Sequence, residues 1–389
     1  MISSAIWANF TYKPRMAKLK MNNHDKIKSL TKSLIEDCKI QCPNICNAIE
    51  LSHTQRDKIR LCVEKGGLIP ADASLVVFGS LARNEATQGS DIDWSLLIDG
   101  QANGEHHDAA LAIKSELSKT GLPMPGVTGT FGTLIFSHDL VHQIGGDDDT
   151  NRNTTRRVLL LLESCPIESS NSRPVYERVA KQIVNRYLEQ EPDVLLPDGT
   201  RRIPRFLLND VVRYWRTMAV DYARKVRDRN AEGWALRNIK LRLSRKLTFV
   251  SGMLSCLDYR LNPHRGENGG SLFNATGMKV LDAQEHIRKC VATTPLDIVS
   301  RSIEGYSPDE THKAELVGSI LGSYDTFLGI LNDEEKRKRL KGLRPGEHEK
   351  DPIFQECREL GVGFQNGLST LFFETNDELT KATQEYGVF

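Results

Sequence analysis

The sequence predicts an α+β protein in which a small mixed β-sheet with flanking helices is followed by a mostly α-helical domain. Short apolar runs separated by Gly, Asp and Pro follow Pro70, whereas beyond Thr154 apolar residues recur mainly at helical spacing. A chain of 389 residues is also too long for one compact core. We therefore expect an N-terminal extension and helices at 1–70, an α/β core at 71–165 and a helical C-terminal region at 166–389.

Helices are expected before the sheet. Residues 1–25 are predicted to be poorly ordered, as an extension or as sequence that precedes a later start at Met16 or Met21. Their basic, acid-free character would also suit an organelle transit segment. Helical spacing then predicts one helix from Lys26 to about Ala48 and a second from Ser52 to Glu64.

The core is expected to alternate strands and helices. Its elements, in order, are a strand at Ser74–Phe78, a turn and short helix at Gly79–Glu85, a strand at Asp91–Ile98, a helix at Glu105–Leu117 and a strand at Thr133–Phe136. The segment 121–132, rich in Gly, Pro and Thr, is expected to form loops or a short strand.

The remaining chain is predicted to be helical. The helices expected are Thr154–Glu163, Val175–Leu188, Pro204–Arg227, Ala235–Leu257, Asp297–Ile303, Glu310–Leu331 and Asn376–Tyr386. Residues 262–271 and the charged stretch Lys336–Pro352 are predicted to be loops.

Composition excludes several classes of protein. The 52 basic and 51 acidic residues give a net charge of +1, which argues against a surface coated with positive charge for nucleic acid but allows a local patch. No apolar run reaches the roughly 18–20 residues that cross a membrane. The eight cysteines contain no zinc-like CxxC pair and fit a reducing cytoplasm. The cluster Cys38, Cys42 and Cys46 is interpreted as small, partly buried residues rather than an iron–sulfur site.

Chemistry-bearing residues gather between Leu75 and Asp99. The first strand delivers the chain to Gly79, where glycine permits a sharp turn, and Ser80 follows at the start of a helix that can hold a phosphate. On the second strand Asp91 and Asp93 alternate onto one face. Two adjacent carboxylates repel one another unless a cation joins them, and Mg²⁺ prefers carboxylate, water and phosphate oxygens. The pattern therefore predicts a metal and nucleotide site.

This arrangement of a hydrophobic-Gly-Ser turn, a spacer and Asp-x-Asp resembles the signature of the DNA-polymerase-β-like nucleotidyltransferases. The resemblance covers Ser74–Glu163 and implies that Gly79 and Ser80 contact a nucleoside triphosphate and that Asp91 and Asp93 bind metal. Arg83 stands where many members carry a basic residue, which implies a phosphate contact; an exposed structural arginine is the alternative. A looser similarity, at 121–132 and after Thr154, is to the PII-protein uridylyltransferases.

The resemblance also implies a third carboxylate from a later strand. Between Glu116 and Asp139 the sequence contains no acid, so Asp139 is the first candidate and the run Asp147–Asp149 is the second. An enzyme that uses two acids, or an inactive one, is the alternative.

Basic residues of the helical region are candidates to complete the site. Arg237, Lys240, Arg242, Arg245 and Lys246 share one predicted helix, and Lys240 is taken as a nucleotide-binding residue. The alternative is a solvated basic helix face. Asp210, Arg213 and Tyr214 are expected in a buried polar network or, second, in the pocket lining.

The sequence also offers an alternative set of metal ligands, of the types used by metal-dependent phosphohydrolases. They are His106, His107 and Asp108, together with His138, Asp139 and His142. Such sites need His and Asp on an all-helical bundle, whereas the first group opens a helix in an α/β segment. We therefore reject this interpretation.

The sequence thus predicts a cytoplasmic, non-membrane enzyme that uses Mg²⁺ or Mn²⁺ and transfers a nucleoside monophosphate from a nucleoside triphosphate, with ATP favoured. A protein or RNA acceptor is preferred, in a regulatory, toxin-like or defence role. A small-molecule acceptor, cyclic-nucleotide formation and a non-catalytic nucleotide- or partner-binding scaffold remain alternatives. The oligomeric state is left open.

Overall fold

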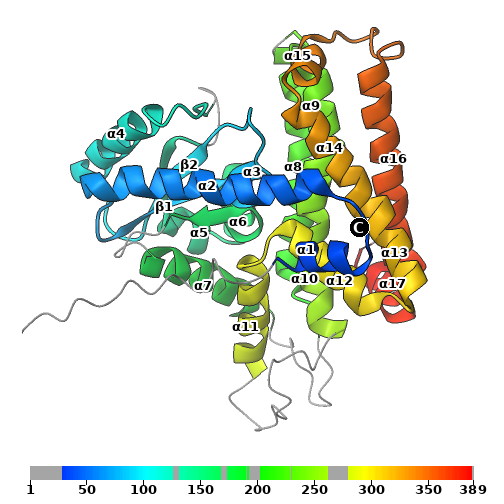
Figure 1. The fold of residues 1–389 in the computed structure, drawn as a ribbon. Helices are drawn as coiled ribbons and strands as arrows, with labels where there is room; N and C mark the ends of the chain where they lie inside the picture. Colours follow the sequence, from blue (N-terminus) through cyan, green and yellow to red (C-terminus); the bar gives the residue numbers. More distant parts are fainter. Residues whose placement is uncertain are drawn as a thin grey trace, which may run out of the picture.

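The computed structural model describes residues 29–125, 131–167, 173–189, 191, 202–228, 230–261 and 279–387. A sheet-containing core occupies one side of the molecule and a bundle of helices the other (Figure 1). The long helix α2 (Pro43–Gly66) runs from the helical side across the core. The predicted α+β class, with a small mixed sheet and a mostly helical C-terminal part, is confirmed.

The sheet has four strands in the order β3-β2-β1-β4. Strand β1 (Ala73–Phe78) pairs antiparallel with β2 (Asp93–Ile98) and with β4 (Ser164–Pro166), while β2 pairs parallel with β3 (Thr133–Phe136). All six residues of β1 are buried, as a central strand covered on both faces requires. Strand β4 was not predicted, because three residues are too few to show a sequence period.

Helices cover both faces of this sheet. Inward residues of one face join a core with α2 and α4 (Gly104–Ser118). The other face packs against three helices, α5 (Ser137–Val141), α6 (Asn151–Leu162) and α7 (Arg173–Glu189), and their core continues into the helical region. The short α3 (Gly79–Ala82) follows β1 directly. The core and the helical region therefore share one continuous hydrophobic interior.

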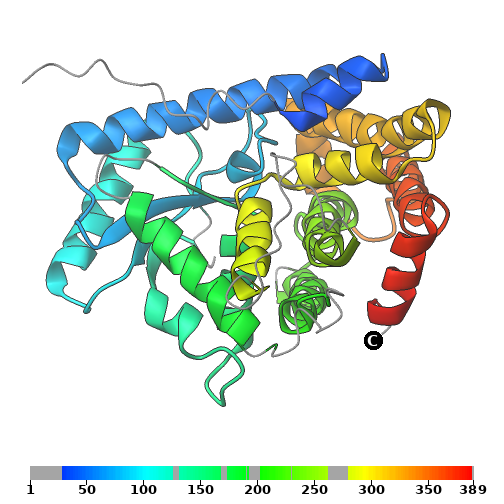
Figure 2. The ribbon, with the colours of Figure 1, turned by 90° about the horizontal axis from the view of Figure 1, so that it is seen from below.

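The helical region begins with α8 (Arg205–Asp228), which packs against α6 and α10 (Lys246–Leu261). Its next stretch is continuous, from α9 (Trp234–Lys240) through a π-helical turn η2 (Leu241–Arg245) into α10. The helices that follow are α11 (Lys279–Val291), α12 (Pro295–Tyr306), α13 (Glu310–Val317), η3 (Gly318–Gly322), α14 (Ser323–Asn332), α15 (Glu334–Gly342), α16 (Pro352–Phe373) and α17 (Asp377–Tyr386). Helix α11 lies beside α7 (Figure 2). No described helix combines the length and apolar character that a membrane crossing requires.

The N-terminal helices differ from the prediction. One helix was expected to run to about Ala48, but α1 (Leu30–Asp37) ends early, and Lys39 adopts a left-handed conformation with φ of 55°. A new helix begins at Pro43, because proline suits the first helical position, and it continues without a break through Ser52. Residues 1–25 and the loop expected at 262–271 lie outside the described residues.

The charged stretch Lys336–Pro352 was predicted as a loop, and this was wrong for its first part, which belongs to α15. The helix buries only Leu340, so it shows no apolar period. Asp333 caps its N-terminus, acids occupy its first turn and bases its last, which stabilises it through the helix dipole. Helix α16 was missed although its buried residues do recur at helical spacing.

Candidate functional site

The antiparallel pairing of β1 and β2 places the Gly-Ser turn beside Asp93. Phe78 is the register partner of Asp93, so Gly79 leaves β1 at the end of the sheet where β2 begins. Gly79 has φ of +67°, and a Cβ atom there would lie 3.0 Å from Oδ2 of Asp93. Glycine is needed at this position both for the backbone conformation and for the close approach.

Hydrogen bonds hold the spacer between the turn and the aspartates. Ser80 donates its hydroxyl to Oγ of Ser90 at 3.1 Å, and that oxygen also accepts the backbone N–H of Thr87 at 2.9 Å. Asn84 makes the intervening turn with φ of 61°. Ser80 is half-buried. The turn and the Asp-x-Asp segment are therefore joined into one rigid loop.

The structure brings Asp91 and Asp93 together, although not as two positions of one strand. Strand β2 begins at Asp93, and Asp91 is exposed in the loop before it. Burial, followed by the charge of Asp91, raises the pKa of Asp93 to about 7, with Glu163 adding to the rise and Arg245 and Lys240 opposing it. Two carboxylates close enough to raise a pKa in this way repel one another.

This donor set fits a divalent cation. A bound cation would relieve the repulsion between the two carboxylates, and the exposure of Asp91 leaves room for water and phosphate oxygens as further ligands. Among the described residues, no group of three or more His, Cys, Asp and Glu side chains is arranged to hold a metal by itself. A metal at this edge would therefore rely on Asp91, Asp93 and ligands from outside the chain.

Asp139, expected to be the third carboxylate, lies elsewhere. It sits in α5, past the C-terminal end of β3, whereas Asp93 is at the N-terminal end of the parallel strand β2. The five steps from Asp93 to Ile98 separate these strand ends by about 17 Å. Asp139 acts electrostatically on Arg156.

The run Asp147–Asp149 is also turned away from the pair, because Asp149 forms an ion pair with the buried Arg157 at 2.9 Å. The structure brings neither predicted candidate to the Asp91–Asp93 pair.

Glu163 is the carboxylate that sequence reasoning missed at this edge. It precedes β4, and its neighbour Ser164 pairs with Phe78, so it lies at the same end of the sheet as Gly79. It is buried and accepts bonds from Arg83 at 2.5 Å and from Arg245 at 2.7 Å. Burial opposes ionisation, but Arg245 and Arg83 lower the pKa of Glu163. The short strand that delivers it left no signal in the sequence.

Arg83 is placed away from any phosphate by this network. It is only 4% exposed, so the alternative of an exposed arginine does not hold either. Its guanidinium pairs with Glu163 and, at 2.9 Å, with Glu85. Tyr324, from α14, donates to Glu85 at 2.8 Å. Arg83 therefore joins the core to the helical region, and its prediction as a phosphate contact finds no support in this geometry.

Lys240 faces the aspartates from the helical side. It ends α9, immediately before the π-helical turn η2, a distortion that often marks functional positions. Burial, then the charge of Arg337, lowers the pKa of Lys240 to about 8, while Asp91 acts in the opposite direction. Within the described residues Lys240 has no ion pair or hydrogen-bond partner through its ammonium group.

The other basic residues of this helix are engaged elsewhere. Arg242 donates to Asn238 at 2.9 Å, and Lys246 donates to Gln365 at 2.6 Å. Arg245 is the exception, since it bonds Glu163 and also acts on the pKa of Asp93. The basic stretch is therefore partly a site-facing surface and partly a solvated face.

Asp210 lies in a buried polar network, as first expected, whereas Arg213 is only half-buried. Tyr214 is buried, and the charges of Glu163, Arg245 and Arg83 act on its pKa. Asp210 accepts from Arg157 at 2.7 Å and also from Tyr187. Arg213 donates to Asn151 at 3.1 Å. These contacts tie α8 to α6 and α7 rather than lining the edge that carries Asp93.

The rival histidine site is not formed. His106 is buried and bonds Asp72 at 3.0 Å, where it completes the N-terminal cap of α4. His138 and His142 pack against each other, with ring centroids 5.2 Å apart. The two groups serve different local contacts.

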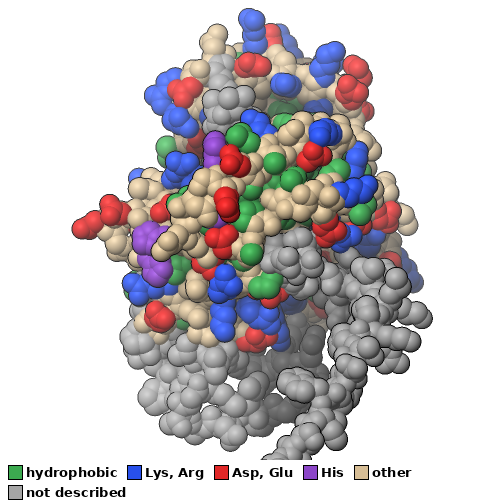
Figure 3. Space-filling model, turned by 90° about the vertical axis from the view of Figure 1, so that its left-hand side faces the viewer, with side chains coloured by type: hydrophobic (Ala, Val, Ile, Leu, Met, Phe, Trp, Pro, Cys, Tyr) green, Lys and Arg blue, Asp and Glu red, His purple; other side chains and the backbone are tan. Residues whose placement is uncertain are grey.

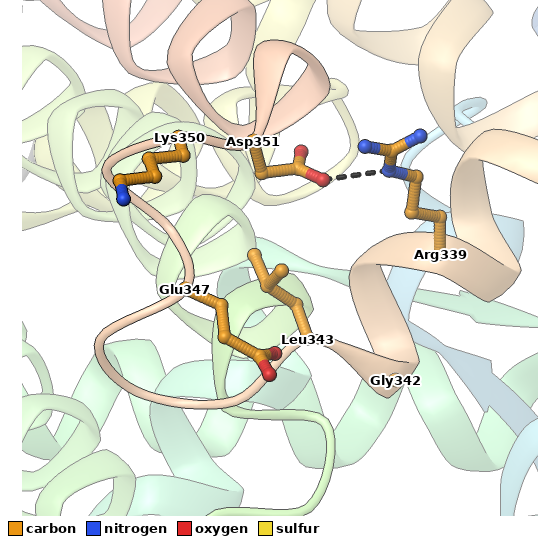
Figure 4. Close-up of a pocket in the computed structure, with 6 residues that line it drawn as sticks. All are labelled: Arg339, Gly342, Leu343, Glu347, Lys350 and Asp351. Atoms are coloured by element: carbon orange, nitrogen blue, oxygen red, sulfur yellow. Dashed lines mark hydrogen bonds and ion pairs between the residues drawn. The ribbon is translucent and has the colours of Figure 1, made fainter.

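Surface features lie away from this edge. The recess between α15 and α16 is lined by none of the candidate residues, and within it Arg339 donates to Asp351, the N-cap of α16, at 2.6 Å (Figure 4). On the face of the core that points away from the helical region, acidic and basic side chains are interspersed (Figure 3). Neither feature competes with the carboxylate edge as a candidate active site.

Comparison with known proteins agrees with this geometry. Residues 56–125 match the family model of a nucleotidyltransferase domain, and this segment contains Gly79, Ser80, Asp91 and Asp93. The match is consistent with the polymerase-β-like superfamily. A search of curated proteins found no match. The chain carries a nucleotidyltransferase domain and is, by that domain, an enzyme of nucleotidyl transfer that uses a nucleotide substrate.

Proposed function

We propose that this protein transfers a nucleoside monophosphate from ATP, or from another nucleoside triphosphate, to a hydroxyl group of a protein or RNA and releases pyrophosphate. The observation that carries this proposal is the contact between Gly79 and Asp93 at the sheet edge, with Asp91 beside them and Lys240 facing them. The proposed core is 71–165, preceded by the extension and helices at 1–70 and followed by the helical region at 166–389.

Each residue has a role in this proposal. Asp91 and Asp93 would hold Mg²⁺ or Mn²⁺, which when bound supplies charge that favours attack at the α-phosphorus and departure of pyrophosphate. Ser80, whose hydroxyl donates to Ser90 in this structure, would turn that proton to a phosphate oxygen. Lys240 contributes positive charge to the triphosphate. The acceptor oxygen bonds the α-phosphorus, the bond to the bridging oxygen breaks, and pyrophosphate leaves with the electron pair while the acceptor's proton passes to solvent.

A macromolecular acceptor is supported by the openness of the site. Asp91 is exposed, so the reacting edge is accessible to an acceptor larger than a metabolite. The loose similarity to uridylyltransferases points the same way. For such a transfer we propose a regulatory, toxin-like or defence role. All eight cysteines are free, which supports the cytoplasm as the proposed compartment.

A second candidate function is a nucleotide-binding scaffold without turnover. The observation in its favour is that no third acid side chain, among the residues the structure describes, reaches the pair in an unpaired state, since Glu163 is held by two arginines. On this alternative the protein would bind a triphosphate and release no pyrophosphate.

Label transfer tests the acceptor. Native protein is incubated with each of four α-³²P-labelled nucleoside triphosphates, Mg²⁺ or Mn²⁺ and a whole-cell extract, beside an Asp91→Asn/Asp93→Asn variant that keeps the shape of both side chains. We expect label on a macromolecule with the native protein only, and its sensitivity to protease or to ribonuclease names the acceptor. Pyrophosphate release with label confined to small molecules would refute a macromolecular acceptor, and binding without release would favour the scaffold.

A further inference from the structure

Helix α15 of the helical region contacts the spacer loop of the proposed active site through the side chain of Arg337. The guanidinium of Arg337 lies against Gly89, where a Cβ atom would stand 2.7 Å from its Cζ and closer still to Nη1. Any side chain at position 89 would therefore displace the guanidinium. Gly89 is two residues before Asp91. Because Gly89 has no side chain, the guanidinium of Arg337, more than 240 residues later in the sequence, can lie beside this loop.

Arg337 is poorly compensated at this position. It is half-buried, and within the described residues its guanidinium makes one polar contact, a bond of 3.4 Å from Nη1 to Oγ1 of Thr87, at the long limit for a hydrogen bond. No carboxylate lies within ion-pair distance of it in the described part of the chain. Burial lowers the pKa of Arg337, with Asp91 opposing that effect. A half-buried guanidinium without a close carboxylate indicates a place for an anion.

Lys240 is a second cation without a close carboxylate among the described residues, and it lies near Arg337. Among the neighbouring charges, that of Arg337 lowers the pKa of Lys240 most. The two cations, one from α9 and one from α15, therefore repel one another. The neighbouring arginines do not add to this surplus, because Arg83 and Arg245 are matched by Glu85 and Glu163. With Asp91 and Asp93 assigned to metal, Lys240 and Arg337 remain as two positive charges at the reacting edge.

Several contacts fix α15 where Arg337 can act. Asp333 caps the helix by accepting the N–H of Lys336 at 3.0 Å. Arg339 is anchored to Asp351 (Figure 4). Asn332, just before the helix, accepts the backbone N–H of Gln88 at 2.9 Å, so the spacer loop is also bonded to the start of this segment. The guanidinium is thus presented by a fixed helix, as a binding group should be.

We propose that Arg337, admitted by Gly89, forms with Lys240 a subsite for the β- and γ-phosphates of the nucleotide, the pair that leaves as pyrophosphate. The inference rests on the proposed nucleotidyl transfer and adds a binding residue from the far C-terminal region. Because the contact is to the leaving group and not to the nucleoside, Arg337 selects triphosphates over monophosphates without reading the base.

The test compares pyrophosphate, ATP and AMP as probes of the full-length protein with Mg²⁺ by titration calorimetry. Arg337→Gln should weaken pyrophosphate and ATP about tenfold or more while AMP stays within about twofold. Gly89→Ala, which keeps the charge but fills the gap, should weaken the same two probes. Lys338→Gln removes a neighbouring exposed cation of the same helix and should change none of them.

A double variant separates ligand binding from a structural role. If Gly89 acts by admitting Arg337, Gly89→Ala should have no further effect in the Arg337→Gln background. Additive effects, or equal losses for AMP and pyrophosphate, would overturn the inference, as would an Arg337→Gln variant that behaves like Lys338→Gln. Should the native protein release pyrophosphate from a nucleotide while Arg337→Gln binds every probe normally, the subsite alone fails. Arg337-dependent pyrophosphate binding without any turnover would instead keep the subsite and refute the transfer reaction.

Discussion

At the scale of single residues, the site depends on charged groups held in partly buried positions. Asp93 has a raised pKa because burial and Asp91 disfavour its ionised form, and Lys240 has a lowered pKa because burial and Arg337 disfavour its ammonium form. The charged form of each group is therefore destabilised in the ligand-free protein, and a bound counter-ion would stabilise it. A cation relieves the aspartates and a phosphate relieves Lys240.

The pKa of Lys240 leads to a prediction for nucleotide affinity. Its ammonium form, with a pKa of about 8 in the free protein, is stabilised by a bound triphosphate, so the pKa is higher in the complex. Between about pH 7, where Asp93 begins to lose its charge, and pH 8, the affinity for ATP should be nearly constant, and it should fall as the pH rises above 8. Lys240→Arg, whose guanidinium stays charged, should bind ATP with a flat profile between about pH 7 and 9.

Titration calorimetry at each pH checks this expectation, with Lys240→Met as the uncharged control. The control should bind ATP about tenfold more weakly at pH 7 and show no decline above pH 8. A native profile that matches Lys240→Met in shape would show that this lysine does not contact the nucleotide.

At the scale of elements, a buried network joins the sheet to the helices behind the site. Glu163 ends α6 and bonds Arg245 of η2, while Glu85 of the spacer loop bonds Tyr324 of α14. Arg83 pairs with both carboxylates. The network fixes η2, and hence Lys240 just before it, against the edge that carries Asp93.

Removing the shared carboxylate should be costly. Glu163→Gln leaves Arg83 and Arg245 without their common partner, and breaking a buried ion pair from one side costs about 3–5 kcal/mol. We expect urea denaturation to show a loss of this order in the free energy of unfolding. Glu378→Gln, which removes the exposed partner of Lys381, serves as the control and should leave stability unchanged. Equal stability of the two variants would mean that the network does not hold the halves together.

The elements also show what sequence can and cannot predict. The strands β1 and β2 and the turn at Gly79 were predicted because alternation and a glycine mark them locally. Helix α15 was missed because its stabilisation comes from charges and a cap rather than from an apolar period. Strand β4 is formed by pairing with β1, a long-range contact that three residues cannot reveal.

The same distinction applies to the candidate site. Gly79, Ser80, Asp91 and Asp93 lie within fifteen residues of one another, so their spacing was informative. Glu163 and Arg337 reach the same edge only through tertiary folding. Arg83 was misplaced because its spacing to Ser80 says nothing about the carboxylates that bury it.

At the scale of the whole molecule, three parts of the chain meet at the sheet edge. The core supplies the Gly-Ser turn and the aspartates, the stretch α9–η2 supplies Lys240 and Arg245, and α15 supplies Arg337. Helix α2 packs along the core and also against α14, so both parts share one support. The helical region is therefore part of the proposed active site.

The most direct measurement is pyrophosphate release by the native protein from each nucleoside triphosphate in the presence of extract, with and without Mg²⁺ or Mn²⁺. The account predicts release from at least one nucleotide that is lost on chelation, restored by the metal and reduced about 100-fold or more in Asp93→Asn. Asp108→Asn, an exposed acid of α4, should retain full activity. Release that needs no metal, or that survives in Asp93→Asn as in Asp108→Asn, would contradict the assignment of the sheet edge as the active site.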